Sequence, residues 1–275
     1  MESKRRNRLI RLIRMVLLII MIVCLIQIGR AYYLSLQHRA QQKELEEFSE
    51  AAKAAEPVQT RETDQPLKEE LSMDETAQEK KEPALLAQYA ALYEMNKDMI
   101  GWLNAEGTRI DYPVVRSMDQ EYYLHHNFYG DEDKYGCLFV KDIADVDTPG
   151  TNFIIYGHNM KDGAMFGELD LYQKEAFWKE HPFFSFNTLY EERTYEIVAV
   201  FFSQIYEKDE EVFKYYEFYE AKTPEEFMTF YENIKKLSLY DTKVEASYGD
   251  TFVTLSTCAY HVEDGRIVVV AKRRS

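Results

Sequence analysis

An apolar run near the N-terminus constrains this chain more than any other feature. From Met15 to Ile28 the only polar residue is Gln27. This run is short for a bilayer, which requires roughly 20 apolar residues in a helix. It reaches that length when it is extended to Leu34, because Arg30 can snorkel to the headgroups and a pair of tyrosines suits the interface. We therefore predict a transmembrane anchor over residues 15–34.

The residues before the run predict its orientation. Residues 1–14 contain six basic side chains and one acidic side chain. Positive charge beside a membrane segment favours the cytoplasmic side. We expect a single-pass protein with residues 1–14 as a cytoplasmic tail and the rest of the chain outside the cell membrane. A cleaved signal peptide has a similar order of residues and is the alternative, although no small-x-small cleavage site follows the run.

The charge of the remaining chain argues against one class of partner. Of the 33 basic and 48 acidic residues, seven and one lie within residues 1–34, which leaves 26 basic against 47 acidic and a formal charge of −21. Nucleic-acid binding needs basic side chains for phosphate contacts. We therefore expect no nucleic acid partner.

Residues 35–84 are polar, with Phe48 as their only aromatic side chain. Ala, Glu, Lys and Gln dominate, and Pro57 and Pro66 interrupt the helical stretches. Such a composition cannot bury a core. We interpret the segment as an extracellular stalk, partly helical, and predict the folded domain over residues 85–275.

Short runs of β-branched and aromatic residues alternate with turn residues in the predicted domain. This spacing predicts a mainly β fold. Helical patterns occupy residues 84–96, 165–179 and 223–238, and in the last of these Thr223 and Glu226 match a capping box. The expected strands are residues 109–115, 137–140, 152–158, 194–206, 250–257 and 266–273. We expect a β-barrel with an N-terminal helix and inserted helices.

The three cysteines have different settings. Cys24 lies within the anchor, and Cys137 lies in a strand-like run typical of a buried side chain. Cys258 ends the run "TFVTLSTC", where a strand gives way to a polar loop. Exported proteins normally pair their cysteines, so a Cys137–Cys258 disulfide is one interpretation. The other is that Cys258 is a nucleophilic thiol.

A nucleophilic thiol needs a proton acceptor nearby. Four of the six histidines are better explained as solvated or structural, namely His38, His125, His126 and His181. His158 ends the predicted strand "NFIIYGH", and His261 lies three residues after Cys258. Spacing alone does not choose between these two.

Arg266 opens the last predicted strand. If residues 250–257 and 266–273 are antiparallel neighbours, Cys258 and Arg266 lie at the same end of the sheet. A guanidinium there could hold the oxyanion of a tetrahedral acyl intermediate, although an edge cation that limits aggregation is the alternative. A Cys/His pair with such a cation describes acyl transfer from an amide or ester.

Other site chemistry has little support. The chain contains no Cys-x-x-Cys pair, no His-x-x-x-His pair and no glycine-rich phosphate loop. The acidic segments at residues 129–136 and 141–147 are interpreted as solvated turns. We expect no metal and no cofactor.

Several motifs together resemble the class B sortases, cysteine transpeptidases of Gram-positive cell surfaces. The resemblance covers about residues 88–273 and includes the position of the helix before the cysteine strand. The motifs are "NKDMIGWL" (96–103), "IDYPVV" (110–115), "EYYLHHNF" (121–128), "NFIIYGHNMKDGAMFGELDLY" (152–172), "TLSTC" (254–258) and "RIVVVAK" (266–272).

The resemblance implies roles for individual residues. Cys258 would attack the threonine carbonyl of a sorting signal, His158 would exchange protons with the thiol and the leaving amine, and Arg266 would stabilise the oxyanion. It favours His158 over His261 by analogy. Substrate contacts are implied for Ser256, Leu124, Tyr156 and Tyr216.

This sequence departs from the family pattern at two places. Gln120 stands where an asparagine is frequent, so recognition there can differ. Ala259 and Tyr260 follow the cysteine where some relatives carry acidic residues, so no carboxylate is obvious as a third triad member, and Glu263 and Asp264 are interpreted as loop charges.

The resulting hypothesis is a membrane-anchored transpeptidase. It would cleave surface proteins after threonine in an NPxTx motif, or a related SPxTx or PPxTx motif, and pass the acyl group to an amine of peptidoglycan or its lipid-linked precursor. Hydrolysis by water is a variant of this hypothesis. The alternative from another class is an extracellular binding module, or an inactive relative, in which Cys258 is structural.

Overall fold

The computed structural model describes residues 2–55, 84–117, 119, 121–141, 150–259 and 264–274. It comprises two compact units, Met1–Leu45 and Glu46–Ser275. The helices are α1 (Glu2–Ala55), α2 (Ala87–Met95), α3 (Tyr122–His125), the 3-10 helix η1 (Leu169–Gln173), α4 (Glu175–Glu180), the 3-10 helix η2 (Tyr215–Glu217) and α5 (Pro224–Leu237). The strands are β1 (Met99–Ala105), β2 (Ile110–Ser117), β3 (Leu138–Lys141), β4 (Asn152–Tyr156), β5 (Phe183–Thr188), β6 (Thr194–Gln204), β7 (Phe252–Cys258) and β8 (Gly265–Arg273).

Helix α1 is continuous from the basic tail through the apolar run into the first part of the predicted stalk. Between Ile10 and Ala54 it contains an 18-residue stretch of mean hydropathy 2.7, long and apolar enough to cross a membrane. The large apolar side chains from Met15 to Ile28 are exposed. The expected helical character of the stalk is thus found as far as Ala55, and Pro57 and Pro66 lie outside the described residues.

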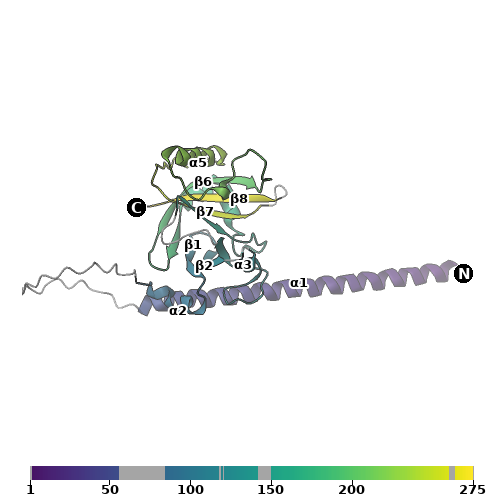
Figure 1. Cartoon of the computed structure of the whole chain (residues 1–275). Coiled ribbons are helices and arrows are strands. Elements are labelled where there is room, and N and C mark those ends of the chain that lie inside the picture. Colours follow the sequence, from purple (N-terminus) through teal and green to yellow (C-terminus); the bar gives the residue numbers. More distant parts are fainter. Residues whose placement is uncertain are drawn as a thin grey trace, which may run out of the picture. The chain divides into compact units, whose positions relative to one another are not determined.

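Eight strands close into a barrel in the order β1-β2-β3-β4-β7-β8-β6-β5. The pairs β2–β3 and β4–β7 are parallel, and the other pairs whose register is defined are antiparallel. Parallel neighbours require long connections. The long connection from β4 to β7 therefore lets two strands far apart in sequence lie side by side, and Figure 1 shows β6, β7 and β8 together near α5.

The side chains of β7 and β8 alternate between two apolar clusters, as the pleat of a strand requires. Val253, Leu255, Ile267 and Val269 are buried in the barrel interior. Phe252, Val268 and Val270 belong to a second cluster on the outer face, which also contains Phe227, Phe230 and Ile234 of α5. Helix α5 thus covers the outer face of these strands with one apolar stripe.

The start of α5 agrees with the predicted capping pattern. The Thr223 side chain accepts a hydrogen bond from the Glu226 N–H at 3.2 Å, and Pro224 occupies the first turn. The Glu226 carboxylate accepts from the Lys222 N–H at 2.7 Å, one residue before the cap. The capping box is therefore confirmed, with its return bond displaced by one position.

The helix predicted over residues 165–179 is found as two short helices that begin only at Leu169. Residues 169–173 form η1, residues 175–180 form α4, and Met165 has a positive φ of 53°. The preceding loop is held by tertiary contacts: Glu168 accepts from the Arg109 N–H and Nε–H, and the Met165 N–H donates to the Tyr112 hydroxyl. These contacts favour a tight turn where the local apolar spacing favours a helix.

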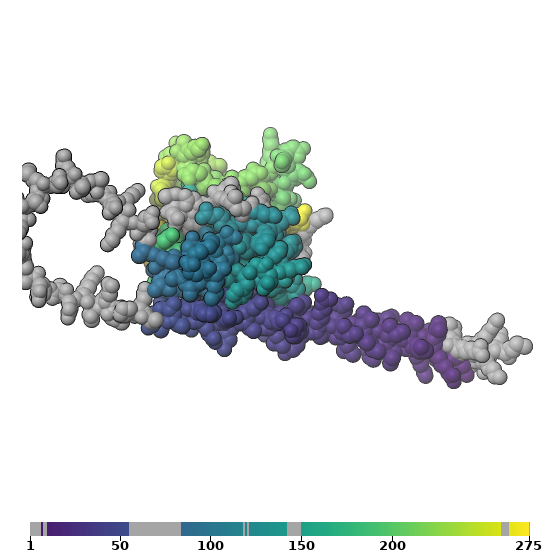
Figure 2. Space-filling view, turned by 60° about the horizontal axis from the view of Figure 1, so that its bottom comes forward, coloured from purple at the N-terminus to yellow at the C-terminus, as the bar shows by residue number. Residues whose placement is uncertain are grey.

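The first half of the domain forms one side of the barrel. Figure 2 shows the blue residues of the β1–β2 region beside the teal residues around α3 and β3 on one face. The Tyr123 hydroxyl donates to Asp98 at 2.8 Å, and the Asn96 amide donates to the Phe128 carbonyl at 2.8 Å. These bonds fix the segment that contains Leu124 against the start of β1.

Candidate active site

Three candidate residues meet at one end of the sheet. Cys258, the last residue of β7, lies directly opposite Arg266 of β8 in the antiparallel register. Opposite residues in such a pair have Cβ atoms about 4.5–5.5 Å apart and share a face. Strand β4 is parallel to β7 with Tyr156 opposite Ser256, so His158, two residues further, is level with Cys258. The β7–β8 register also confirms the prediction that residues 250–257 and 266–273 are antiparallel neighbours.

The shared face is the outer face of the barrel. Cys258 has the same parity in β7 as Phe252 of the outer cluster, and Arg266 has the same parity in β8 as Val268 and Val270. The Cys258 residue is exposed, whereas His158 and Arg266 are half-buried. The thiol is therefore open to a substrate approaching from outside the barrel.

A backbone carbonyl orients the histidine ring. The Nε2 atom of His158 lies 2.8 Å from the Leu124 carbonyl oxygen. A carbonyl only accepts hydrogen bonds, so this Nε2 must carry a proton. In the neutral ring Nδ1 is then the nitrogen that can take a proton.

The Arg266 guanidinium is held by its own turn. Its Nη1 atom donates to the Asp264 carbonyl at 3.0 Å and to the Gly265 carbonyl at 2.9 Å. These two bonds use only one nitrogen of the fork, and an arginine fork has five N–H donors. The residue can therefore hold an anion while its own position stays fixed.

The cysteines are not paired. Cys137 and Cys258 are both free thiols, which overturns the disulfide interpretation. Cys137 is buried, as the sequence predicts, and burial raises the pKa of its thiol. A buried thiol kept protonated is unreactive, so Cys258 is the accessible thiol of the folded domain.

Comparison with known proteins decides the family. The chain matches the family model "Sortase domain" over residues 103–274. It is 38% identical over 186 residues to sortase B of Listeria monocytogenes, covering 66% of this chain and 72% of that protein. The chain belongs to the class B sortase family. It is accordingly a cysteine transpeptidase, a class of enzyme that acts on surface proteins.

Solved structures agree with this assignment. Sortase B of Bacillus anthracis in complex with AAEK1 superposes with a TM-score of 0.61 at 34% identity, covering 70% of this chain and 87% of that one. The same organism's sortase B in complex with AAEK2 gives a TM-score of 0.68 at 30% identity, covering 87% and 98%. The predicted sortase-type barrel with an N-terminal helix and inserted helices is therefore confirmed.

The candidate substrate-binding residues of this sortase lie in different settings. Ser256 is buried, and its hydroxyl is 2.7 Å from the Tyr215 hydroxyl of η2. Tyr156 stacks on Phe139 at 5.7 Å between ring centroids. Burial raises the pKa of Tyr156 well above its usual range and that of Tyr215 to about 12, so both phenols are neutral at physiological pH.

Two further candidates flank these residues. Leu124 lies in α3 and contributes the carbonyl that contacts His158. Tyr216 lies in η2, and its hydroxyl accepts from the Tyr206 N–H at 2.9 Å. The positions of Gln120, His261 and Glu263, all singled out from the sequence, lie outside the described residues, and so does Tyr260.

Sequence reasoning missed the polar residues that support the site. Asn159 donates to the Cys258 carbonyl, and Tyr215 covers Ser256. The only signal for Asn159 was its place directly after His158. No sequence spacing indicates the contact of Tyr215, because it depends on how the long β6–β7 connection folds back over the barrel.

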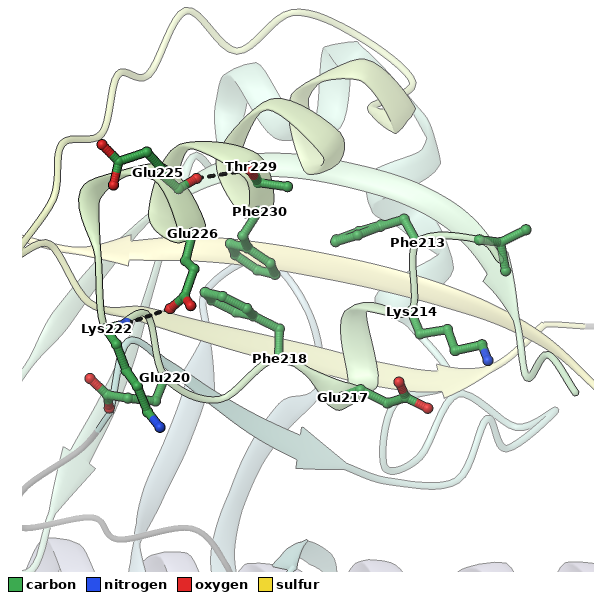
Figure 3. A pocket seen from close by; sticks show the side chains of 11 residues that line it. Phe213, Lys214, Glu217, Phe218, Glu220, Lys222, Glu225, Glu226, Thr229 and Phe230 are labelled. Carbon is green, nitrogen blue, oxygen red and sulfur yellow. Dashed lines mark hydrogen bonds between the residues drawn. The ribbon is translucent and has the colours of Figure 1, made fainter. Parts of the chain in front are cut away.

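The sortase also has a surface pocket of about 600 Å³ between η2 and α5. Figure 3 shows the rings of Phe218 and Phe230 stacked in it, 4.1 Å between centroids, with the Phe213 ring nearby. The pocket is also lined by four glutamates and two lysines, namely Glu217, Glu220, Glu225, Glu226, Lys214 and Lys222. None of its lining residues is one of the candidate catalytic or substrate-binding residues.

Proposed function

We propose that this sortase is a membrane-anchored enzyme that joins surface proteins to the cell wall. It cleaves a C-terminal sorting motif after threonine and transfers the new carboxyl end to an amine of peptidoglycan or of its lipid-linked precursor. The observation that supports this proposal most is the cross-strand pair Cys258–Arg266 with His158 level with it on the neighbouring strand.

The first half of the reaction forms a thioester. The Cys258 thiol gives its proton to Nδ1 of His158, its sulfur attacks the threonine carbonyl carbon, and the resulting oxyanion faces the Arg266 guanidinium. His158, protonated on Nδ1 as well as on Nε2, gives the Nδ1 proton to the leaving amide nitrogen. The carbon–nitrogen bond then breaks, and the chain up to threonine remains on the sulfur.

The second half reverses these roles. An acceptor amine attacks the thioester carbon, His158 takes a proton from that amine on Nδ1, and the Cys258 sulfur leaves. Arg266 stabilises the second oxyanion as it did the first. Water in the place of the amine gives hydrolysis.

The motif proposal is NPxTx or a related SPxTx or PPxTx sequence. The similarity to proteins named sortase B supports the NPxTx form. The departure from the family pattern at Gln120 is the reason for including the related forms. The anchor proposal rests on the apolar helix of residues 15–34 and the basic residues before it, with the catalytic domain outside the cell.

Intact-mass spectrometry tests the proposal directly. The full chain in detergent is incubated with a panel of peptides of the form x-P-x-T-x, alongside the Cys258→Ala variant. We expect a mass gain equal to the peptide up to threonine, absent in the variant while its circular dichroism spectrum is unchanged. No adduct and no cleavage with any peptide, on a folded chain with a free thiol, would favour a binding module or an inactive relative.

A further inference from the structure

The peptide unit that follows Cys258 is held at both ends. The Cys258 carbonyl accepts a hydrogen bond from Asn159 Nδ2 at 2.8 Å. On the other side of the same peptide unit, the Ala259 N–H donates to the Gly265 carbonyl at 2.8 Å. A peptide unit is planar, so these two bonds fix its orientation and thereby the backbone from which the Cys258 side chain projects.

The Asn159 side chain takes the place of a strand hydrogen bond. The Gly157 N–H donates to the Ser256 carbonyl at 3.4 Å, as in a parallel ladder. The next bond of such a ladder would join the N–H of residue 159 to the carbonyl of residue 258. The chain turns away after His158, whose carbonyl accepts from the Phe166 N–H at 2.9 Å. The side-chain amide of Asn159 therefore donates to the Cys258 carbonyl in place of the backbone N–H of residue 159.

A second acceptor holds the Asn159 amide. Asp170 Oδ2 lies 3.5 Å from Asn159 Nδ2, and Asp170 Oδ1 is buried without a hydrogen-bond partner within the described part of the chain. The Cys258 carbonyl can only accept a hydrogen bond, and Asp170 Oδ2 accepts from the same nitrogen. The NH₂ group of Asn159, with its two donors, must therefore face them.

We propose that Asn159 is a positioning residue, which ties the backbone of Cys258 to the loop that contains His158 and so fixes the thiol relative to the imidazole, with Asp170 orienting its amide. This inference rests on the proposed roles of Cys258 and His158. The orienting element of the site is then the side-chain amide of Asn159, which is hydrogen-bonded to the backbone of the nucleophile.

Two variants of Asn159 test the inference in the full chain with the reactive peptide. Asn159→Asp keeps the shape and removes both donors, and Asn159→Ala removes the donors without adding charge. A misplacement of about 1 Å can cost roughly 100-fold in rate. We expect kcat to fall about 100-fold in both variants, while KM for the peptide stays within about twofold of wild type.

Asp170 provides the conservative test. Asp170→Asn keeps an oxygen that can accept from the Asn159 amide, whereas Asp170→Leu does not. We expect Asp170→Asn to retain most of kcat and Asp170→Leu to lose it. Equal loss in the two variants would overturn the orienting role of Asp170.

Asn152 provides the matched control. It is the first residue of β4, the strand that leads into the loop of Asn159, and its Nδ2 donates to the Phe218 carbonyl at 3.0 Å, which is the same type of bond. We expect Asn152→Asp to lower Tm and to leave kcat near wild type. If Asn159→Asp keeps kcat within threefold of wild type, the positioning role is wrong. The same conclusion follows if Asn159→Asp and Asn152→Asp lower Tm equally and also lower kcat equally.

Alkylation of Cys258 separates this inference from the proposed function. If the wild-type chain forms no acyl-enzyme with any peptide, the proposed function fails, but iodoacetamide still reports on the thiol. Slower alkylation in both Asn159 variants than in wild type and Asn152→Asp supports the positioning role. Equal alkylation rates in all four proteins contradict it.

Discussion

At the scale of single residues, a main-chain carbonyl lies beside the ring of the candidate catalytic histidine, in the place that a carboxylate has in a Ser-His-Asp triad. The Leu124 carbonyl accepts a hydrogen bond from the Nε2–H of His158 and so orients the ring. A neutral carbonyl stabilises an imidazolium less than a carboxylate would.

Arg266 gives a residue-scale prediction. Replacing it by lysine keeps the charge but loses the planar fork, which is anchored to the Asp264 and Gly265 carbonyls and which we propose binds the oxyanion. Loss of one oxyanion donor costs about 100- to 1000-fold in kcat, and we expect Arg266→Lys to fall in that range in steady-state peptide cleavage.

The matched control for this substitution is Arg273→Lys. Arg273 lies at the other end of β8 and pairs with Glu191 on the surface. Its replacement should leave kcat/KM within about twofold, because exposed ion pairs contribute only about 0–1 kcal/mol. If Arg266→Lys cleaves within threefold of wild type, Arg266 does not bind the oxyanion.

At the scale of secondary-structure elements, the sequence predicts the regular parts of the fold better than the turns. Runs rich in Val, Ile and Phe predict β4, β6, β7 and β8, because each is buried on both faces. Strand β5 was missed, although its burial alternates along "FFSFNT". The sequence does not show this alternation, because Phe183 is apolar although only half-buried, and because His181 and Pro182 directly precede the strand.

The site shows the same limit. Cys258 and Arg266 were predicted to lie together because both flank one short loop between adjacent strands. The contacts of Asn159 and Asp170 depend on the loop after β4 and on η1, where the structure has two short helices in place of the one predicted. Polar side chains in such a loop have partners determined by the tertiary fold, which no local pattern specifies.

Helix α5 gives the element-scale prediction. Thr223→Ala removes the hydroxyl that accepts the Glu226 N–H. Loss of such a cap costs about 1 kcal/mol, which for a domain of this size lowers Tm by about 2–4 °C. Thermal unfolding followed by circular dichroism measures this change.

Thr229→Ala is the control in the same helix. The Thr229 hydroxyl donates to the Glu225 carbonyl one turn earlier, a bond that adds little to helix stability. Alanine is also the better helix former. We expect Tm to stay constant or rise slightly, and an equal fall in both variants would show that the Thr223 cap has no special contribution.

At the scale of the whole molecule, the chain separates its charges along its length. The six basic residues of residues 1–14 are what favours a cytoplasmic N-terminus, whereas residues 35–275 carry a formal charge of −21.

The orientation can be tested with the cysteines that the chain already has. Cys24 lies in the predicted anchor, and Cys137 is buried with its thiol pKa raised by burial, so Cys258 is the thiol that a water-soluble reagent can reach in the folded protein. A membrane-impermeant maleimide should therefore label the full-length protein in intact cells, as measured by the mass shift of the purified protein. The Cys258→Ala variant should remain unlabelled until it is denatured, which shows that the signal comes from this residue. Labelling of wild type only after lysis would place the catalytic domain in the cytoplasm and exclude a role at the cell wall, because the acceptor amines lie on the other side of the membrane.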